Sequence, residues 1–417
     1  MVDYRIPAID EQNRKFTVAS NDGTIEVDLI EVIGRGGSCI AYKAEKRVAG
    51  ASPRAVVVKE YYPQEQDVLH GVSYIRRAAG EEIHLETKQG YADAASKEQI
   101  TKEKKRQKDN VKREIDVTHQ LSYDPKNVQN NAYAFNADYI SERGDSSYIV
   151  IDTTEGCTLR KLLHEFNGRI GIEKAIEYTR ELLMVAEKVL FRPQKSFCHG
   201  DIKPENIFMA GMNPSDDDAL EKAPRIVLLD FGSVFRPEDY KSYAKDIETI
   251  IRAADKILYN EGIGCSSVGY RSELIQEVFI QKQEYASSEK DPKYAAALVN
   301  TINRINCSVD LYSIIQCFFE CAIGKVYPGD VPLTARKIKR ICDMDDAVAD
   351  QMIKMGEKNR LGEYISTKEI MEDLDVLAAL LRKDADPRVL LDEITKELSQ
   401  FEDYEIEEDL LGEVELG

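Results

Sequence analysis

The sequence predicts an α+β protein in which a region of strands is followed by a larger, mainly helical region. Before residue 153, strands are predicted at residues 15–33, 55–60 and 147–152. From Leu159 the apolar spacing changes from two residues to about 3.6, the period of an α-helix. We therefore expect the mainly helical region to begin near Leu159.

Composition and charge narrow the class of protein. With 417 residues, the chain is long enough for two or three domains. Its hydrophobic content of 43% is ordinary for a globular protein. Its formal net charge of -19 argues against nucleic acid as a partner and would suit a basic protein substrate. Neither a signal peptide nor an apolar run of about 18 residues is found, and the eight cysteines lack zinc-type spacing. We expect a cytoplasmic protein without a membrane span.

The first strands lead into a glycine-rich segment. Residues 15–33 predict a hairpin around the turn at residues 21–23 (NDG). Its second strand runs into residues 34–42 (GRGGSCIAY), where glycines would let backbone amides approach phosphate oxygens. The candidate phosphate-binding residues are Gly34, Gly36, Gly37 and Ser38.

The next strand ends in a lysine and is followed by a long segment of uncertain role. Residues 55–60 (AVVVKE) predict an apolar strand carrying Lys59, which is costly to bury without a partner. Taken alone, Lys59 could equally reach solvent. Residues 94–121 are expected to be helical, with Ser96 as a candidate N-cap. We make no structural prediction for residues 64–95.

A compact polar motif follows the first long helix expected after the boundary. Residues 147–152 (SYIVID) predict a buried strand, and apolar spacing over residues 172–186 predicts the helix. The motif itself is residues 198–208 (CHGDIKPENIF), and an apolar strand at residues 226–229 (IVLL) runs directly into residues 230–232 (DFG). The strand should bring Asp230 close to the motif. A polar loop beside a core strand is the alternative interpretation.

These residues resemble the catalytic loop and the DFG segment of Hanks-type serine/threonine protein kinases, in a bacterial-like variant. The resemblance extends over about residues 24–380 and implies a bilobal fold: a small antiparallel-sheet lobe with one helix, and a larger, mainly helical lobe. It places the small lobe at residues 1–152, with an insertion at about 64–110, and the large lobe at 153–383. An acidic helical tail is expected at 384–417.

The resemblance implies catalytic roles for four residues. Asp201 would take the proton of the acceptor hydroxyl, and Lys203 would neutralise the transferring phosphoryl group. Lys59 would bind the α- and β-phosphates and be held by a glutamate of the following helix. We choose Glu114 for this role rather than Glu103, because Glu114 lies beside the apolar stripe of that helix.

Cofactor binding is implied in the same way. The cofactors would be ATP and Mg²⁺, with Mn²⁺ as a substitute, and Asn206 and Asp230 would hold the metal. Ile151 would be the gatekeeper, and the backbone of Asp152 and Thr154 would bind the adenine edge. The resemblance also implies structural roles for His199 in the catalytic loop and for Phe231 and Gly232 in the DFG segment.

The chain departs from the kinase pattern at several positions. Cys39 replaces the third glycine of the phosphate loop, and Gly200 replaces an arginine that many kinases use to bind a phosphorylated loop. The segment at residues 267–273 is one residue short and lacks the usual proline. Ser267 would lie beside Asp201, and Glu273 would pair with Arg360.

One buried carboxylate is also implied beneath the catalytic loop. Asp310 would bind the backbone of that loop, at the start of a strongly apolar helix that ends near Gly324. Asp310 could also serve as the N-cap of this helix.

The predicted function is the ATP- and Mg²⁺-dependent transfer of the γ-phosphoryl group to serine or threonine hydroxyls of proteins, with Asp201 as base. A small-molecule phosphotransferase of the aminoglycoside or choline kinase type is the first alternative. A nucleotide-binding pseudokinase scaffold is the second. The regulator is not predicted.

Overall fold

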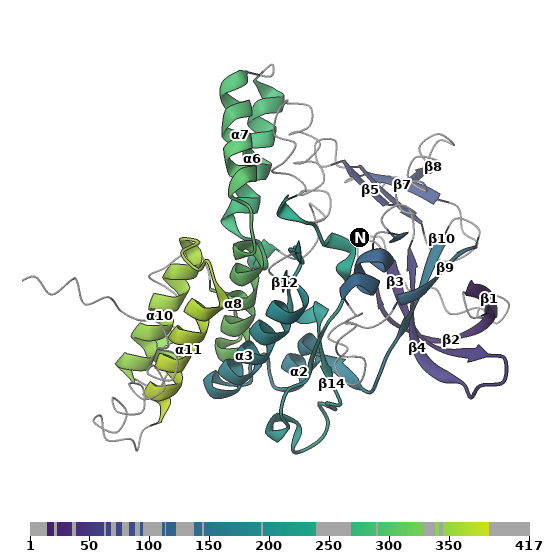
Figure 1. Ribbon diagram of the computed structural model, residues 1–417, viewed down its shortest axis with the longest axis horizontal. Coiled ribbons are helices and arrows are strands. Elements are labelled where there is room, and N and C mark those ends of the chain that lie inside the picture. The colour runs from purple at the N-terminus through teal and green to yellow at the C-terminus, as the bar shows by residue number, and fades with distance from the viewer. Residues whose placement is uncertain are drawn as a thin grey trace, which may run out of the picture.

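The computed structural model describes residues 15–20, 23–35, 39–61, 64–67, 72–76, 83–87, 92–94, 111–112, 114–121, 137–143, 146–192, 195–238, 268–288, 291–327, 338–341 and 345–382. The predicted tail at 384–417 lies outside these residues. Strands occupy the right of Figure 1, and helices occupy the centre and left. The predicted bilobal α+β architecture is confirmed.

The first sheet has six antiparallel strands in the order β1-β2-β3-β4-β10-β9. Its strands are β1 (Lys15–Ser20), β2 (Gly23–Arg35), β3 (Cys39–Val48), β4 (Arg54–Tyr61), β9 (Ala137–Arg143) and β10 (Ser146–Asp152). The predicted hairpin is confirmed, because β1 pairs with β2 up to Ser20 opposite Gly23. Alternate residues of β3, such as Ile40, Tyr42 and Ala44, are buried, so one face of the sheet forms the core of this lobe.

The insertion contains a second sheet that the sequence did not predict. It comprises β5 (Gln64–Asp67), β6 (Val72–Arg76), β7 (Ile83–Thr87) and β8 (Ala92–Ala94), which pair antiparallel in chain order. β5 has the sequence QEQD and carries no apolar residue. Periodicity cannot detect such a strand, because only its pairing with β6 defines it.

A helix packs against the first sheet. Residues 111–112 and 114–121 are helical, and we call this segment the Glu114 helix. Its buried residues Val111 and Ile115 form an apolar cluster with Tyr61 of β4 and Ile149 of β10. The earlier part of the predicted helix, with Ser96 and Glu103, lies outside the described residues.

The larger region contains seven described helices, whose buried side chains form two apolar clusters. The helices are α2 (Leu159–Glu165), α3 (Ile172–Val189), α6 (Glu273–Ser287), α7 (Pro292–Arg304), α8 (Ser308–Ile323), α10 (Asp346–Arg360) and α11 (Thr367–Leu381). The short strands are β11 (Gly156–Thr158), β12 (Phe191–Arg192), β13 (Lys195–Ser196), β14 (Ile207–Ala210) and β15 (Ile226–Leu228). α8 lies at the centre of this region, and nearly all of its side chains are buried.

The helices predicted from apolar spacing are present, with one correction. α8 begins at Ser308 with Cys307 as its N-cap residue, so the N-cap interpretation of Asp310 is wrong. Gly324 ends α8 in the left-handed conformation, as predicted (φ 74°). None of the helices among the described residues is both long enough and apolar enough to cross a membrane.

A close helix contact yields a stability prediction. A Cβ atom at Gly356 of α10 would lie 2.3 Å from Cε2 of Tyr327, whose ring packs on Phe319. We expect Gly356→Ala to lower the free energy of unfolding by about 1–3 kcal/mol, although alanine favours helices. Chemical denaturation measures the change. As a control in the same helix, Asp350→Ala at an exposed site should change stability by less than about 0.5 kcal/mol. An equally stable Gly356→Ala variant would contradict the predicted clash.

Candidate active site

The catalytic-loop residues selected from the sequence lie in contact with one another. Lys203 Nζ is 2.6 Å from Asp201 Oδ2. The 3₁₀ turn η1 (Pro204–Asn206) brings Asn206 back, so that its Nδ2 donates to the carbonyl oxygen of Asp201 at 2.8 Å and to Oδ2 at 3.0 Å. Both bonds use Nδ2, and Oδ1 of Asn206 accepts no bond from the part of the chain that the structure describes.

Asp310 lies beneath this loop and is fully buried. Its Oδ2 accepts the backbone N–H of His199 at 2.6 Å, and its Oδ1 accepts that of Gly200 at 3.0 Å. Burial raises the pKa of Asp310, although His199 and the two amide bonds oppose the shift. This is the contact that the kinase resemblance implied.

The structure also explains the glycine at position 200. Gly200 has a φ of +76°, and a Cβ atom there would lie 3.1 Å from the carbonyl oxygen of Ser233. A side chain at this position would therefore strain the backbone and crowd the segment after Asp230. An arginine does not suit this conformation of the loop.

His199 joins the catalytic loop to the segment that carries Asp230. Its Nδ1 accepts the N–H of Asp201 at 3.3 Å, so Nε2 carries the proton and donates to the carbonyl of Leu229 at 2.9 Å. Cys198 and Phe235 exchange two backbone hydrogen bonds, of 2.8 and 3.0 Å. These bonds hold the two segments side by side.

Lys59 lies between two carboxylates. Its Nζ is 2.9 Å from Oε1 of Glu114 and 3.1 Å from Oδ1 of Asp230. Burial disfavours the charge on Lys59, but Asp230 and Glu114 outweigh this effect and raise its pKa. Burial likewise opposes the charge on Asp230, and Lys59 outweighs it and lowers that pKa. Glu114, which we chose from the sequence as the partner of Lys59, is therefore the glutamate that contacts it.

The oxygen atoms of this site fit a nucleotide-bound metal. Mg²⁺ usually takes one or two protein ligands and completes its shell with phosphates and water. Asp230 and Asn206 offer two such ligands, and the described residues contain no cluster of three or more His, Cys, Asp or Glu side chains suited to a metal. Asp230 has a strained left-handed backbone (φ 63°), as is frequent at functional sites. Phe231 is buried beside it, 5.3 Å from the ring of His199.

The structure describes some of the residues that are predicted to bind the nucleotide. Gly34 lies in β2, while Gly36, Gly37 and Ser38 lie outside the described residues. Ile151 and Asp152 end β10, and the hydroxyl of Thr153 donates to the carbonyl of Thr154 at 3.3 Å.

The sequence analysis missed a lysine near the predicted adenine site. Lys46 of β3 is buried and forms an ion pair with Asp152. Lys46 lies 106 positions before Asp152, and no local sequence pattern indicated this pair.

The predicted pair between Glu273 and Arg360 is wrong. Arg360 donates from Nε and Nη2 to Oε2 of Glu357, at 3.0 and 2.8 Å. Glu357 lies three residues earlier in the same helix, where side chains are neighbours. Glu273 contributes only its charge to the raised pKa of Arg360, after the larger effect of Glu357. Ser267 lies outside the described residues.

Sequence reasoning also missed a network beneath the substrate-side segment. Arg160 of α2 donates to Glu205 of the catalytic loop at 2.7 Å and to Oε2 of Glu320 in α8 at 3.2 Å. The hydroxyl of Tyr270 donates to Glu320, and Ser313 Oγ donates to the carbonyl of Tyr270 at 2.7 Å. The network connects the segment before α6 to the catalytic loop. Its members are up to 160 positions apart, so no local spacing could reveal it.

Comparison with known proteins agrees with this geometry. Residues 80–266 match the family model of the protein kinase domain. This stretch of the chain is therefore similar to protein kinase domains. A probable serine/threonine-protein kinase of Clostridium acetobutylicum is 25% identical over 256 residues, or 58% of this chain. The alignment covers 30% of that relative's length. The matched stretch includes Glu114, Asp201 and Asp230. Lys59 lies outside it and contacts Glu114 and Asp230.

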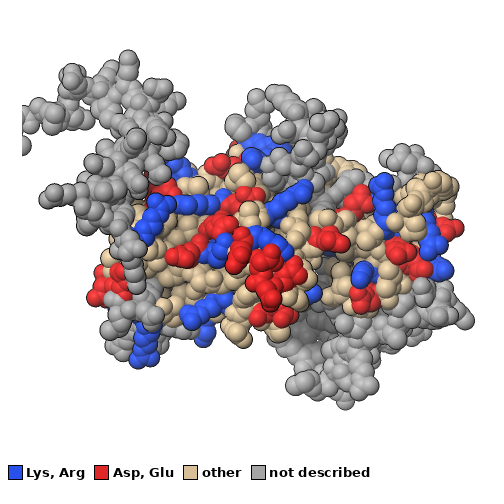
Figure 2. Space-filling view, turned by 90° about the horizontal axis from the view of Figure 1, so that it is seen from below, with Lys and Arg blue, Asp and Glu red and all other residues tan. Residues whose placement is uncertain are grey.

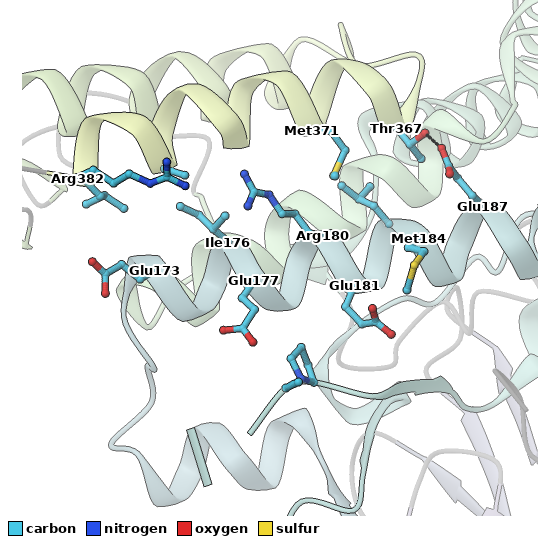
Figure 3. A pocket seen from close by; sticks show the side chains of 15 residues that line it. Glu173, Ile176, Glu177, Arg180, Glu181, Met184, Glu187, Thr367, Met371 and Arg382 are labelled. Carbon is cyan, nitrogen blue, oxygen red and sulfur yellow. Dashed lines mark hydrogen bonds between the residues drawn. The ribbon is translucent and has the colours of Figure 1, made fainter. Parts of the chain in front are cut away.

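A groove lies apart from the candidate site, between α3, α11 and residues 223–224 (Figure 3). Its volume is about 720 Å³, and Arg180, Arg382 and Met371 project toward it. Two of its lining residues, Thr367 and Glu187, are joined by a hydrogen bond. None of the site residues predicted from the sequence lines the groove.

Ion pairs link the residues of the acidic loop between β14 and β15. Lys222 pairs with Asp216 at 2.7 Å and with Asp218 at 3.2 Å. Figure 2 shows the face of the molecule on which this loop lies, with acidic side chains gathered near its centre. The three consecutive aspartates of the loop therefore belong to a solvated surface.

The anchor beneath the catalytic loop can be tested with Asp310→Asn. The substitution places an amide N–H₂ against a backbone N–H, so we expect a loss of about 1–3 kcal/mol in unfolding free energy and weaker phosphotransfer. Asp373→Asn is a matched control, because Asp373 is also buried but binds Lys358 and Tyr364 in the α10–α11 region. The control should lose stability and keep nucleotide affinity. Full phosphotransfer activity in Asp310→Asn would contradict the anchoring role.

The lowered pKa of Asp230 predicts a pH dependence. A carboxyl group whose pKa falls below its usual 3.8 on folding stabilises the protein above that pH, and the contribution is lost as pH falls. The stability difference between wild type and Asp230→Asn should therefore be largest above about pH 5 and shrink toward pH 3. Urea denaturation across this range measures it. A difference that grows with acid would contradict the assigned ion pair.

Proposed function

We propose that this kinase transfers the γ-phosphoryl group of ATP, with Mg²⁺ or Mn²⁺, to serine or threonine hydroxyls of proteins. The observation that carries the proposal is the position of Lys59 between Glu114 and Asp230, beside the linked Asp201, Lys203 and Asn206. The kinase-domain match and the probable serine/threonine kinase relative support phosphotransfer to protein.

The charges of the site suit the reaction. Asp230 and Asn206 would hold the metal, which supplies positive charge against the phosphoryl oxygens when bound. Lys59 would bind the triphosphate while Glu114 holds its ammonium group in place. Lys203 would balance charge on the transferring group, and Asp201 would orient the acceptor hydroxyl and take its proton late.

Several finer points belong to the same proposal. Lys203 stands two residues after Asp201, as in the serine/threonine kinases that the motif resembles. The net charge of -19 favours a basic protein substrate and disfavours nucleic acid. We place the activity in the cytoplasm.

The proposal predicts that Asp201→Asn separates binding from chemistry. With labelled ATP, Mg²⁺ and a basic protein, we expect label on serine or threonine, and a loss of about 10²–10⁴-fold in rate for Asp201→Asn. Calorimetry should show nucleotide affinity changed by less than about threefold, because the acceptor base does not hold ATP. Asp216→Asn makes the same change in the acidic loop and should leave the rate unaltered.

Other outcomes would point to the alternatives. ATP consumption with small metabolites, but without labelled protein, would indicate a small-molecule phosphotransferase. Nucleotide binding without turnover would indicate a pseudokinase scaffold. An Asp201→Asn variant with the wild-type rate would overturn the assigned base.

A further inference from the structure

We propose that Tyr61 is a positioning residue of this kinase, which holds Glu114 in the orientation that binds Lys59; the inference rests on the proposed function. The Tyr61 hydroxyl donates to Oε2 of Glu114, while Lys59 binds Oε1 at 2.9 Å. Both oxygens of the buried carboxylate therefore have a donor. Neither the motifs nor the kinase resemblance selected Tyr61.

The place of Tyr61 in the sheet makes it a rigid support. It follows Lys59 by two residues in β4, so both side chains leave the same face of the strand. β4 is an interior strand, in which Tyr61 pairs with Cys39 of β3 and Ser147 of β10. Only 7% of Tyr61 is exposed.

Tyr61 also contacts the helix that carries Glu114. Its ring belongs to the apolar cluster with Val111, Ile115 and Ile149, and Lys59 Nζ lies 5.9 Å from the ring centroid. The same residue thus contacts the helix, the carboxylate and the ammonium group. Its hydroxyl fixes the direction of the carboxylate, while its ring fixes the distance of the helix from the sheet.

A neutral donor suits this position better than a second cation. The terminal torsion of a glutamate is broad, so one bond leaves the carboxylate free to rotate and two bonds fix its plane. A lysine or arginine in place of Tyr61 would share the charge of Glu114 with Lys59 and weaken that ion pair. Burial and the charge of Glu114 raise the pKa of Tyr61 well above 10.0, so the hydroxyl stays protonated.

The neighbouring Asp230, a predicted metal ligand, gives a reason for the second hydrogen bond to Glu114. A Cβ atom at Gly232 would lie 3.3 Å from Oε2 of Glu114 and 3.4 Å from Oδ1 of Asp230, and both carboxylates bind the same ammonium group of Lys59. If Asp230 held a metal, Glu114 would remain as the partner of Lys59. The bond to Tyr61 holds Glu114 in place for that state.

The test compares Tyr61→Phe with Tyr42→Phe. Tyr42 is also buried in this sheet and donates to a buried carboxylate, Oε2 of Glu60, at 2.8 Å. Each variant loses one tyrosine–carboxylate bond, so both should show a similar drop in melting temperature. Only Tyr61→Phe should lower kcat/KM for ATP, by about tenfold, and raise the Kd of Mg·AMP-PNP similarly. Tyr42→Phe should stay within about twofold.

A double-mutant cycle tests whether Tyr61 acts through Glu114. In a Glu114→Gln background, adding Tyr61→Phe should cause less than about a twofold further loss in affinity for Mg·AMP-PNP. A full additional tenfold loss would overturn the positioning role. Equal affinity losses in Tyr61→Phe and Tyr42→Phe would do so as well, because they would show a general effect on the sheet.

The outcomes separate this inference from the proposed function. If wild type transfers phosphate and Tyr61→Phe matches it in rate and affinity, the inference alone fails. If wild type binds Mg·AMP-PNP without transferring phosphate, the proposed function fails, and the affinities still decide the role of Tyr61. If wild type does not bind the nucleotide, both are overturned.

Discussion

The ion pair of Lys59 with Glu114 and Asp230 is the interaction on which the site depends. A buried ammonium group is stable only when carboxylates surround it, and each carboxylate here comes from a different element. β4, the Glu114 helix and the end of β15 therefore meet at one nitrogen atom. The sheet and the mainly helical region are held together where nucleotide chemistry is proposed.

The catalytic loop depends on a second buried charge. Asp310 holds the backbone of His199 and Gly200 from the first turn of α8, a helix with nearly all of its side chains buried. The ring of His199 is hydrogen-bonded to the carbonyl of Leu229, which links the catalytic loop to the segment of Asp230. Asp201 and Asp230 are thus positioned by one rigid helix, although they belong to separate loops.

Much of the candidate site could be read from the sequence because its spacing is local. Asp201, Lys203 and Asn206 lie within six residues, and a strand followed by DFG requires no knowledge of distant contacts. Glu114 could be chosen because it lies beside the apolar stripe of its helix. The helices from Leu159 onward followed from a 3.6-residue period, and the hairpin from its turn residues.

The sequence by itself determined the fold class, the principal elements and the identity of the catalytic candidates. Only the tertiary structure decided which distant side chains support them. Tyr61 meets Glu114 across 53 positions, Arg160 meets Glu320 across 160, and β5 is a strand only because β6 pairs with it. Arg360 binds Glu357 and not Glu273, because Glu357 is its neighbour on the same helix. Periodicity and motifs report local backbone geometry, whereas these contacts depend on how separate elements pack together.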